Sequence, residues 1–581
     1  MKTKLLSLIL AMVAVIAVLT SCLGGGGGEE PGDDEDEGNP AYTWAKDTEI
    51  IVQLGMNSSS GELSSGCRRY YAGGDNTASQ PVDKAVKDRN KAAKTYSKVD
   101  VKYAYVGTAD DSSDYSWTSA AGQILGQATS TQSSTSPDIY INFAYSLTCA
   151  QIRGAFANLL SLSTGTDDYK YGNHFSFTKD NYNPEITEDN YFDSNAGGGY
   201  FYAYMESLSL TPDSRLYCVG SNYTLDLVRA FYVIPVNVDI MNNITIDAAP
   251  AGDMNDDGVH DIKDFYALVN NGQYGWDYEA LAEYAVAASS DTNEISGADV
   301  GDDQVGLILG KSGLTGSGIL YSTDVEIFKW NATEGKYAYS ATAGKLATLT
   351  DSLNTLMTEN KNGICTTNVG ELKNAGLISG SEGEIAGIRN KFAQGGVLFG
   401  GIICVGSLED QAYQSMRGEG KNGFGVVPVP VFQKGDKYLT SVHNLARIAA
   451  IAANSTNKSE CSAFLDYQST NSADILEDYY KNTLTASTGG LAGEENANML
   501  NYIRNHVRNC FDKTFEDAIA TYMNEGKNDN NKALHDRWSQ KIADKGYAMT
   551  DTGTLYLETL NEKQANLNTI YGQWNSLKAA N

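Results

Sequence analysis

Short apolar runs alternate with longer helical stretches over residues 49–143, and this alternation constrains the fold more than any other feature of the chain. Strands joined in this way by helices form parallel sheets with right-handed crossovers. We therefore expect an α/β fold whose ligands lie beyond the carboxyl ends of the strands. The pattern predicts, in order, a strand at 49–54, a helix at 81–96, a strand at 99–106, a helix at 117–129 and a strand at 137–143.

Polar residues follow two of these predicted strands at the edge where a ligand would lie. Asn57 and Ser58 come after the first strand, and Tyr145 and Ser146 come after the third. We therefore take these four as candidate ligand-binding residues. Each of them is also explained as an ordinary polar loop residue, and for any single one that is the simpler reading.

The first 22 residues have the pattern of a signal peptide, with Lys2 and Lys4 before an apolar core at 5–19. The core ends in Leu-Thr-Ser-Cys, which is typical of a lipobox, so we expect lipidation at Cys22. An ordinary secretory signal and a transmembrane helix are the alternatives, but the apolar run is short for a bilayer. Residues 23–44, rich in glycine and acids, predict a flexible, solvated tether.

Composition limits the class of protein. About 540 residues follow the tether, which is too many for one hydrophobic core and suits two lobes. The formal charge of −29, without a basic block, argues against nucleic-acid partners. Apart from Cys22, the cysteines are scattered with no spacing typical of a metal site.

A second informative stretch runs from Asn422 to Asp466. Its apolar run 424–431 contains Pro428 and Pro430, and proline cannot donate a hydrogen bond to a sheet, so we predict an edge or crossover strand. A polar turn, a further apolar run and a helix at about 459–467 follow. This order suggests a chain that leaves one α/β lobe and enters another.

The sharpest candidate chemistry is an acidic loop at 253–264. Oxygen-bearing side chains alternate there, with a glycine at the turn, as in loops that wrap one calcium ion. The twelfth position holds Asp rather than Glu, as in dockerin-type loops. The other reading is an acidic turn that caps the next helix. The predicted ligands of a structural calcium ion are Asp253, Asn255, Asp257, the Val259 carbonyl, Asp261 and Asp264.

Several of these segments resemble the extracellular solute-binding proteins of ABC importers, in their carbohydrate-binding, maltose-binding-protein-like group. Phe424–Pro430 resembles the family's "FGV-P-P" hinge crossing, and Pro137–Ile139 resembles the start of its third strand. Gly272–Asp277 is similar to a family segment in which Trp276 is a packing anchor and Asp277 caps a helix, and Asp303–Leu307 is similar to its "D-Q-Y/F-G" strand. Where that group often has a sugar-stacking Trp, this chain has Gly-Ser-Leu at 406–408, which puts sugar specificity in doubt.

The resemblance implies a type II, two-lobed periplasmic-binding-protein-like fold with a helical C-terminal block. It implies hinge crossings near 232–236 and 424–431, and further ligand-binding candidates in Gly406, Ser407 and His443, although a lone histidine is more often structural. The lobes expected from it are 45–232 with 425–472, and 233–424 with 473–581.

The function implied is that of a monomeric receptor that captures a sugar or oligosaccharide and delivers it to ABC permease subunits. It would be extracytoplasmic, anchored by lipid to the outer face of the cell membrane, without enzymatic activity or a required cofactor. Two alternatives stay open, a mostly helical surface glycan-binding lipoprotein of the starch-utilisation type and a secreted glycoside hydrolase. No pair of acids can be chosen as catalytic from the sequence, and no GxSxG, HExxH or phosphate-loop motif occurs.

Overall fold

Trp44–Asn581 forms one compact unit of the chain, separate from Met1–Thr43. The computed structural model describes most of this unit, and the account below concerns that part only. The described residues are 48–55, 70–73, 81–107, 117–160, 199–209, 215–270, 275–290, 300–301, 303–311, 313–322, 328–339, 343–418, 421–436, 438–443, 446–484 and 493–507. The predicted signal peptide, Cys22, the tether, Asn57 and Ser58 lie outside the described residues.

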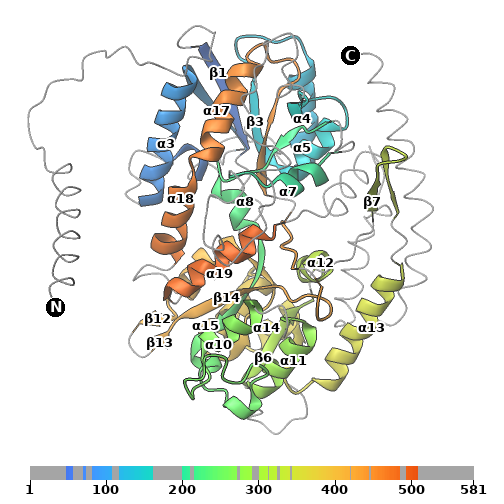
Figure 1. The fold of residues 1–581 in the computed structure, drawn as a ribbon, viewed down its shortest axis with the longest axis vertical. Helices are drawn as coiled ribbons and strands as arrows, with labels where there is room; N and C mark the ends of the chain where they lie inside the picture. The colour runs from blue at the N-terminus through green and yellow to red at the C-terminus, as the bar shows by residue number, and fades with distance from the viewer. Residues whose placement is uncertain are drawn as a thin grey trace, which may run out of the picture. The chain divides into compact units, whose positions relative to one another are not determined.

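The first sheet has five strands in the order β2-β1-β3-β15-β4 (Figure 1). β1 pairs in parallel with both β2 and β3, as the alternation of strands and helices predicts, whereas β15 is antiparallel to β3 and β4. The strands are β1 Thr48–Gly55, β2 Val99–Val106, β3 Ile139–Phe143, β4 Cys218–Val219 and β15 Arg447–Ile451.

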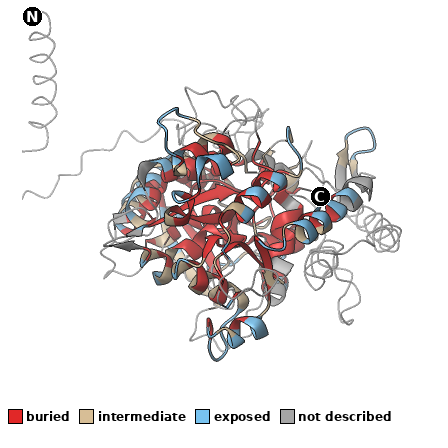
Figure 2. Ribbon diagram, turned by 90° about the horizontal axis from the view of Figure 1, so that it is seen from below, coloured by how far each residue is buried: buried red, intermediate tan, exposed pale blue. Residues whose placement is uncertain are grey.

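Helices cover both faces of this sheet, because side chains alternate between the faces along each strand. In β3, Ile139 and Ile141 belong to the apolar cluster that contains Phe464 and Leu465 of α17, while Tyr140 belongs to the cluster on the opposite face. Figure 2 shows the buried strands inside, with exposed residues on the outer sides of helices. The helices are α3 Pro81–Ser97 and α17 Lys458–Thr470 on one face, with α4 Trp117–Thr129 and α5 Ala144–Gln151 on the other.

The second sheet follows the order β11-β5-β10-β6-β9, and β14 pairs with the other side of β5. β14 therefore lies at an edge, as its prolines predict. Helices α11 and α15 both pack on β6. The strands are β5 Tyr232–Asn237, β6 Val305–Gly310, β9 Ile364–Thr367, β10 Val397–Phe399, β11 Ile403–Cys404 and β14 Phe424–Pro428.

The remaining elements connect and flank the two sheets (Figure 1). They are α7 Tyr202–Ser207, α8 Leu225–Arg229, α9 Val238–Met241, η2 Ile246–Ala248, α10 Ile262–Asn270, α11 Tyr278–Ala287, α12 Gly313–Ser322, α13 Ala343–Glu359, α14 Val369–Asn374, α15 Glu384–Ala393, η3 Val405–Glu409, α16 Gln411–Gln414, α18 Ala473–Asp478, the π-helix η4 Tyr479–Leu484 and α19 Gly493–Asn505, with two small hairpins, β7 Phe328–Asn331 with β8 Lys336–Tyr339 and β12 Arg417–Gly418 with β13 Lys421–Asn422.

The chain crosses between the sheets at different residues from those expected. The stretches 232–236 and 424–431 do not bridge two lobes, because β5 and β14 pair with each other inside the second sheet, with Val426 opposite Pro235. The physical reason is that both runs are apolar and fully buried, so their backbone groups are satisfied by sheet pairing. The first crossing lies just before β5, and the return crossing lies after residue 440.

Trp276 is the packing anchor that the sequence predicts, and Asp277 caps α11 by accepting a hydrogen bond from the Ala280 N–H at 2.9 Å. The indole is fully buried, and its Nε1 donates to the Pro428 carbonyl at 2.7 Å. Its ring lies 5.1 Å from that of Phe265, measured between centroids. Trp276 therefore joins the start of α11 to the edge strand β14.

We expect Trp276→Ala to lower the free energy of unfolding by about 3–5 kcal/mol, because it leaves a large cavity and an unpaired Pro428 carbonyl. Chemical denaturation followed by fluorescence or circular dichroism measures the change. Val286→Ala on α11, the helix that follows Trp276, is the control, since Val286 is 43% exposed, and it should change stability by less than about 0.5 kcal/mol. Equal effects of the two substitutions would contradict the anchoring role.

Candidate functional site

Two short backbone segments connect the sheets, and they lie side by side. Ala230–Tyr232 leads from α8 into β5, and Ser441–His443 lies on the path from β14 to β15. Phe231 forms an antiparallel bridge with Val442. The Tyr232 N–H donates to the Ser441 carbonyl at 3.1 Å, and the His443 N–H donates to the Ala230 carbonyl at 2.9 Å. We call these paired segments the double crossing.

The double crossing gathers three of the stretches in which the sequence places ligand-binding residues. His443 belongs to it. The Val405 N–H, next to Gly406 and Ser407 in η3, donates to the Phe231 carbonyl at 2.9 Å. Tyr145 and Ser146 open α5, where the Ala144 N–H donates to the Ala446 carbonyl at 2.8 Å.

Most of these candidate ligand-binding residues are buried. Tyr145, Ser146 and Ser407 are all buried in this conformation, and His443 is half-buried. The Ser407 hydroxyl has no hydrogen-bond partner among the described residues. A buried hydroxyl without a partner is unfavourable, so this atom marks a place where a bound hydroxyl or water would be stabilised. Their assignment as ligand contacts remains a prediction.

A buried ionic network, which the sequence analysis does not predict, lies beside the double crossing. Arg229, the last residue of α8, is 2% exposed. It donates to Asp226 at 2.9 Å, and two of its nitrogens donate to the carboxylate of Glu409 in η3, at 2.6 and 3.3 Å. Arg447, the first residue of β15, donates to the other oxygen of Asp226 at 3.2 Å. We call these four residues the junction network.

Two tyrosines complete the coordination of Glu409. The hydroxyl of Tyr70 donates to one carboxylate oxygen at 3.0 Å, and the hydroxyl of Tyr479 donates to the other at 2.6 Å. The guanidinium of Arg229 also lies over the Tyr70 ring, with the carbon Cζ 4.9 Å from the centroid of the ring. Glu409 therefore connects η3, which follows strand β11 of the second sheet, to α8, to Tyr70 and to η4.

Charge balance explains how this network is tolerated in the interior. Two guanidinium groups face two carboxylates, and each carboxylate accepts from more than one donor. Burial by itself lowers the pKa of Arg229, but Glu409 and Asp226 outweigh it and raise the pKa well above its ordinary value. Burial, followed by the charge of Glu409, raises the pKa of the Tyr479 hydroxyl. Arg229 and Tyr479 therefore keep their protons, and the network is fixed around neutral pH.

The network also reaches the carboxyl end of the first sheet. Arg447 donates its Nε to the carbonyl of Gly55, the last residue of β1, at 2.8 Å, and its guanidinium lies 4.9 Å from the Phe143 ring at the end of β3. This is the edge at which ligands of α/β sheets lie. A carboxylate paired with a guanidinium group is held in its ionised form, whereas a general acid needs the protonated form. The carboxylates of the network are therefore suited to positioning and binding.

One signal in the sequence could have pointed to this network. Asp226 and Arg229 are two charges three residues apart within the apolar run 224–240, and such charges are rarely buried unless they are paired. Glu409 lies two residues beyond Ser407, in the same η3 element as that candidate. Tyr70, Tyr479 and Arg447 give no comparable signal, because only the fold brings them together.

The predicted calcium loop forms a compact, hydrogen-bonded turn. The Asp253 carboxylate accepts from the N–H groups of Asp257 and Gly258, at 3.1 and 2.6 Å. Asp264 is fully buried and accepts from the N–H of Met254 at 2.8 Å. No group of three or more His, Cys, Asp or Glu side chains among the described residues is arranged to hold a metal. The hydrogen bonds alone account for the shape of the loop.

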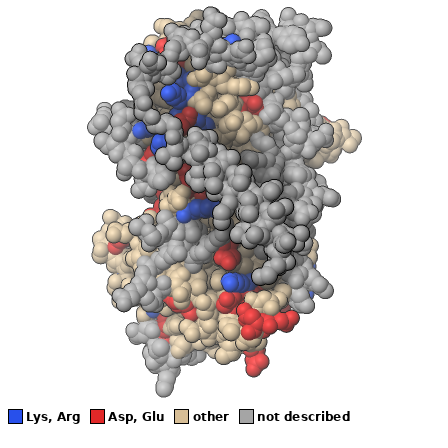
Figure 3. Space-filling view, turned by 60° about the vertical axis from the view of Figure 1, so that its left-hand side comes forward, with Lys and Arg blue, Asp and Glu red and all other residues tan. Residues whose placement is uncertain are grey.

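One side of the molecule shows how charges are distributed over the described residues. On the side drawn in Figure 3, Lys and Arg side chains are scattered between carboxylates in the described part of the chain. None of the described helices is both long enough and apolar enough to cross a bilayer.

No protein-family model matches the sequence, and no curated protein matches it. Solved structures that resemble the fold include family 1 extracellular solute-binding proteins. At TM-scores below 0.5 these likenesses are distant, and the two-sheet architecture rests on the strand pairing of this chain. One is an ABC substrate-binding protein from Listeria monocytogenes in complex with cycloalternan, with 13% identity over 92% of this chain and 100% of that chain and a TM-score of 0.39. A family 1 extracellular solute-binding protein from Alicyclobacillus acidocaldarius has 11% identity over 87% of this chain and 99% of that chain and a TM-score of 0.43. A cyclic maltosyl-maltose binding protein from Arthrobacter globiformis has 13% identity over 90% of this chain and 99% of that chain and a TM-score of 0.43.

We expect the junction network to behave as one unit in a double-mutant cycle. Glu409→Gln and Arg229→Met should each lower the free energy of unfolding by about 3 kcal/mol, because each leaves a buried charge without its partner. The double variant should lose at least about 1 kcal/mol less than the sum of the two. Urea denaturation of the four proteins gives the coupling energy.

The exposed pair Lys481–Glu477, joined at 2.6 Å, is the control for this cycle. Its coupling should stay below about 0.5 kcal/mol, because water screens the charges of a surface pair. Additive effects of the Arg229 and Glu409 substitutions would show that the buried contact does not hold the junction.

Proposed function

We propose that this protein is an extracytoplasmic receptor that binds a sugar or oligosaccharide between two α/β lobes. The observation that carries the proposal is the double crossing, in which two adjacent backbone segments connect separate sheets next to the carboxyl ends of β1 and β3. A few residues at such a connection can absorb the backbone rotation needed for hinge closure. A ligand that contacts both lobes would then stabilise the closed arrangement by its differential affinity.

The polar groups near the double crossing fit a ligand rich in hydroxyl groups. Carboxylates, guanidinium groups and tyrosine hydroxyls accept or donate hydrogen bonds to sugar hydroxyls, and aromatic rings pack against sugar faces. Two solved structures of distantly similar fold are described as bound to oligosaccharides, namely cycloalternan and maltotriose. Sugar or oligosaccharide is accordingly the ligand class we propose, with Tyr145, Ser146, Gly406, Ser407 and His443 as candidate contacts.

The alternatives fit the geometry less well. A glycan-binding lipoprotein of the starch-utilisation type would be mostly helical, whereas this chain has two multi-stranded sheets. A glycoside hydrolase needs one carboxylic acid that holds its proton and a second carboxylate opposite it. In the junction network both carboxylates are bound to arginines. We therefore propose a binding role without catalysis.

We infer the location and the partners of this receptor from its sequence. The lipobox supports lipidation at Cys22 and an anchor on the outer face of the cell membrane. A monomeric receptor held there would deliver its ligand to the permease subunits of an ABC importer. These parts of the proposal rest on the signal sequence and on the family resemblance.

A thermal-melt screen of the mature chain against neutral oligosaccharides, peptides and other solutes tests the proposal. A ligand in a hundredfold excess over its Kd stabilises the folded state by about 2.7 kcal/mol, so the melting midpoint rises with dose. We expect a dose-dependent rise with an oligosaccharide that is recovered unchanged, together with a smaller radius of gyration in solution scattering. Recovery of a cleaved compound would show that the protein is an enzyme and contradict the receptor proposal. A rise of the melting midpoint with peptides alone would overturn the sugar assignment.

We also propose that the loop 253–264 holds a structural calcium ion. The support is its spacing of oxygen ligands, together with Gly258 at a φ of 83°, which permits the turn. Adding 1–5 mM calcium, about the upper range of loop affinities, should raise the melting midpoint of the wild-type chain. Asp253→Asn combined with Asp257→Asn should abolish the rise, whereas Asp247→Asn, an exposed acid outside the loop, should keep it. A midpoint that calcium leaves unchanged would identify the loop as a hydrogen-bonded cap only.

A further inference from the structure

A groove on the first sheet, distinct from the double crossing, has the chemistry of a second binding site. It lies between α3 and β2, the strand at one edge of the sheet, whereas α8 contacts β15 toward the other edge (α3 and α8 are labelled in Figure 1). Its volume is about 360 Å³, within the range of small-molecule sites. It is lined by Ala72, Lys87, Asn90, Lys91, Lys94, Thr95, Val101 and Tyr103.

The wall formed by α3 is basic in a chain of strongly acidic composition. The helix carries five basic and two acidic residues, whereas the whole chain has a formal charge of −29. Lys87, Lys91 and Lys94 recur at helical spacing, so they follow one side of the helix and all line the groove. Lys94 is paired with Asp100 at 2.6 Å. No described carboxylate pairs with Lys91, which is exposed.

A buried arginine adds positive charge beneath this wall. Arg89 is 6% exposed, and among the described residues its N–H groups donate to neutral oxygens, those of Asn90, Tyr223, Ser472 and Tyr71. Burial lowers its pKa to about 10, so it still carries its charge at neutral pH. Because no described carboxylate neutralises Arg89, its field reaches the groove through a medium of low dielectric constant.

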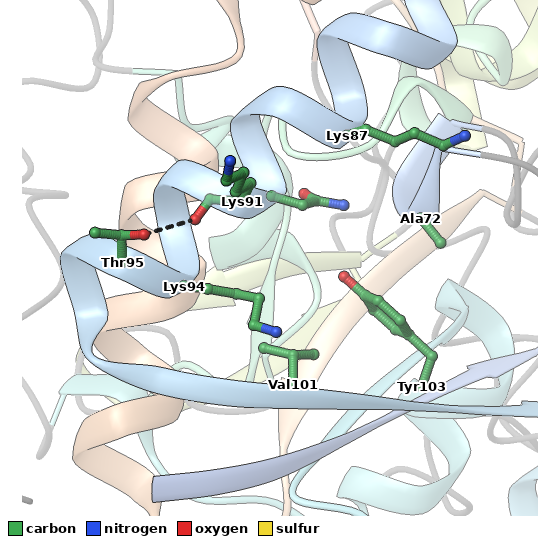
Figure 4. Close-up of a pocket in the computed structure, with 8 residues that line it drawn as sticks. Ala72, Lys87, Lys91, Lys94, Thr95, Val101 and Tyr103 are labelled. Carbon is green, nitrogen blue, oxygen red and sulfur yellow. Dashed lines mark hydrogen bonds between the residues drawn. The ribbon is translucent and has the colours of Figure 1, made fainter. Parts of the chain in front are cut away.

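The opposite wall is aromatic and apolar. Tyr103 and Val101 of β2 face α3 across the groove (Figure 4). The Tyr103 hydroxyl and the Lys94 ammonium group point into the space between the two elements (Figure 4). The Tyr103 hydroxyl has no hydrogen-bond partner among the described residues. An aromatic ring beside cationic donors can pack against the face of a sugar ring while the cations bind a carboxylate.

We propose that this groove binds an acidic sugar residue such as a uronic acid, with Lys87 and Lys91 pairing with its carboxylate and Tyr103 packing against its ring. The site is separate from the one proposed between the lobes. It allows the receptor to hold an acidic glycan on its first lobe while the other site takes a neutral sugar. Surface charge alone would attract any anion, but the aromatic wall favours a sugar that carries the charge.

Calorimetric titration of the full mature chain with digalacturonic acid tests this site, with the neutral galactose disaccharide as the comparison ligand. We expect the acidic sugar to bind and the neutral one to bind at least tenfold more weakly at this groove. Binding should weaken as salt is raised from 0.05 to 0.5 M, because salt screens exposed charges. Lys87→Gln combined with Lys91→Gln should weaken the binding of digalacturonic acid at least tenfold.

Lys84→Gln is the matched control. Lys84 lies on the same helix, is paired with Asp88 and does not line the groove, so its removal should leave the affinity unchanged. Neither variant should change the melting midpoint by more than a degree or two, which separates a lost contact from lost folding. Tyr103→Leu should weaken the binding of digalacturonic acid more than the binding of inorganic sulfate.

Three results would overturn the proposal. They are the absence of binding by digalacturonic acid, equal binding to the Lys87/Lys91 variant, and sulfate binding as tight as that of digalacturonic acid. The last would identify a site for simple anions without sugar recognition. The outcome is independent of the inter-lobe site, because a neutral oligosaccharide in the melt screen should raise the midpoint of the Lys87/Lys91 variant as much as that of the wild type.

Discussion

The hydrogen-bonded pairing of the two crossing segments is the constraint on which the rest of this molecule depends. Each segment alone would be an exposed link between two sheets, and its backbone groups would need partners in water. When they are paired, Ala230–Tyr232 and Ser441–His443 satisfy each other's backbone hydrogen bonds. The pairing also sets the positions of the end of α8, the start of β5 and the path into β15 relative to one another. The candidate site is built from residues that flank these two segments.

The junction network adds specificity to this pairing at a cost in solvation. A buried ion pair is often no more stabilising than an apolar pair of the same size, but removing one partner leaves a charge that the interior cannot solvate. Arg229 is shared by Asp226 and Glu409, and Asp226 is shared by two arginines, so a shift of any one group disturbs the others. Such a network favours a small number of arrangements of α8 and η3.

The sequence predicts ligand-binding residues after β1, after β3, in η3 and in the return segment, and this assignment stays a prediction. Backbone hydrogen bonds connect the last three of these segments with the double crossing. Sequence reasoning missed Arg229, Arg447, Tyr70 and Tyr479, because contacts between residues as far as 339 positions apart leave no local pattern. The stretch 424–431, expected as the return crossing, is a strand of the second sheet, since a buried apolar strand and an apolar crossing have the same composition, whereas the first crossing ends at Tyr232, the start of the expected stretch 232–236.

The sequence by itself determined the α/β class, the first three strands with their helices, the edge position of the proline-containing strand and the capping of α11 by Asp277. These features follow from periodicity, proline chemistry and helix capping, which act over a few residues. Only the tertiary structure decided where the chain crosses between the sheets, which charges meet at the junction, and that Arg89 is buried near the groove between α3 and β2 with no carboxylate partner among the described residues. Those outcomes depend on hydrogen bonds and electrostatic contacts between distant segments, and such contacts exist only once the sheets have formed and brought the segments together.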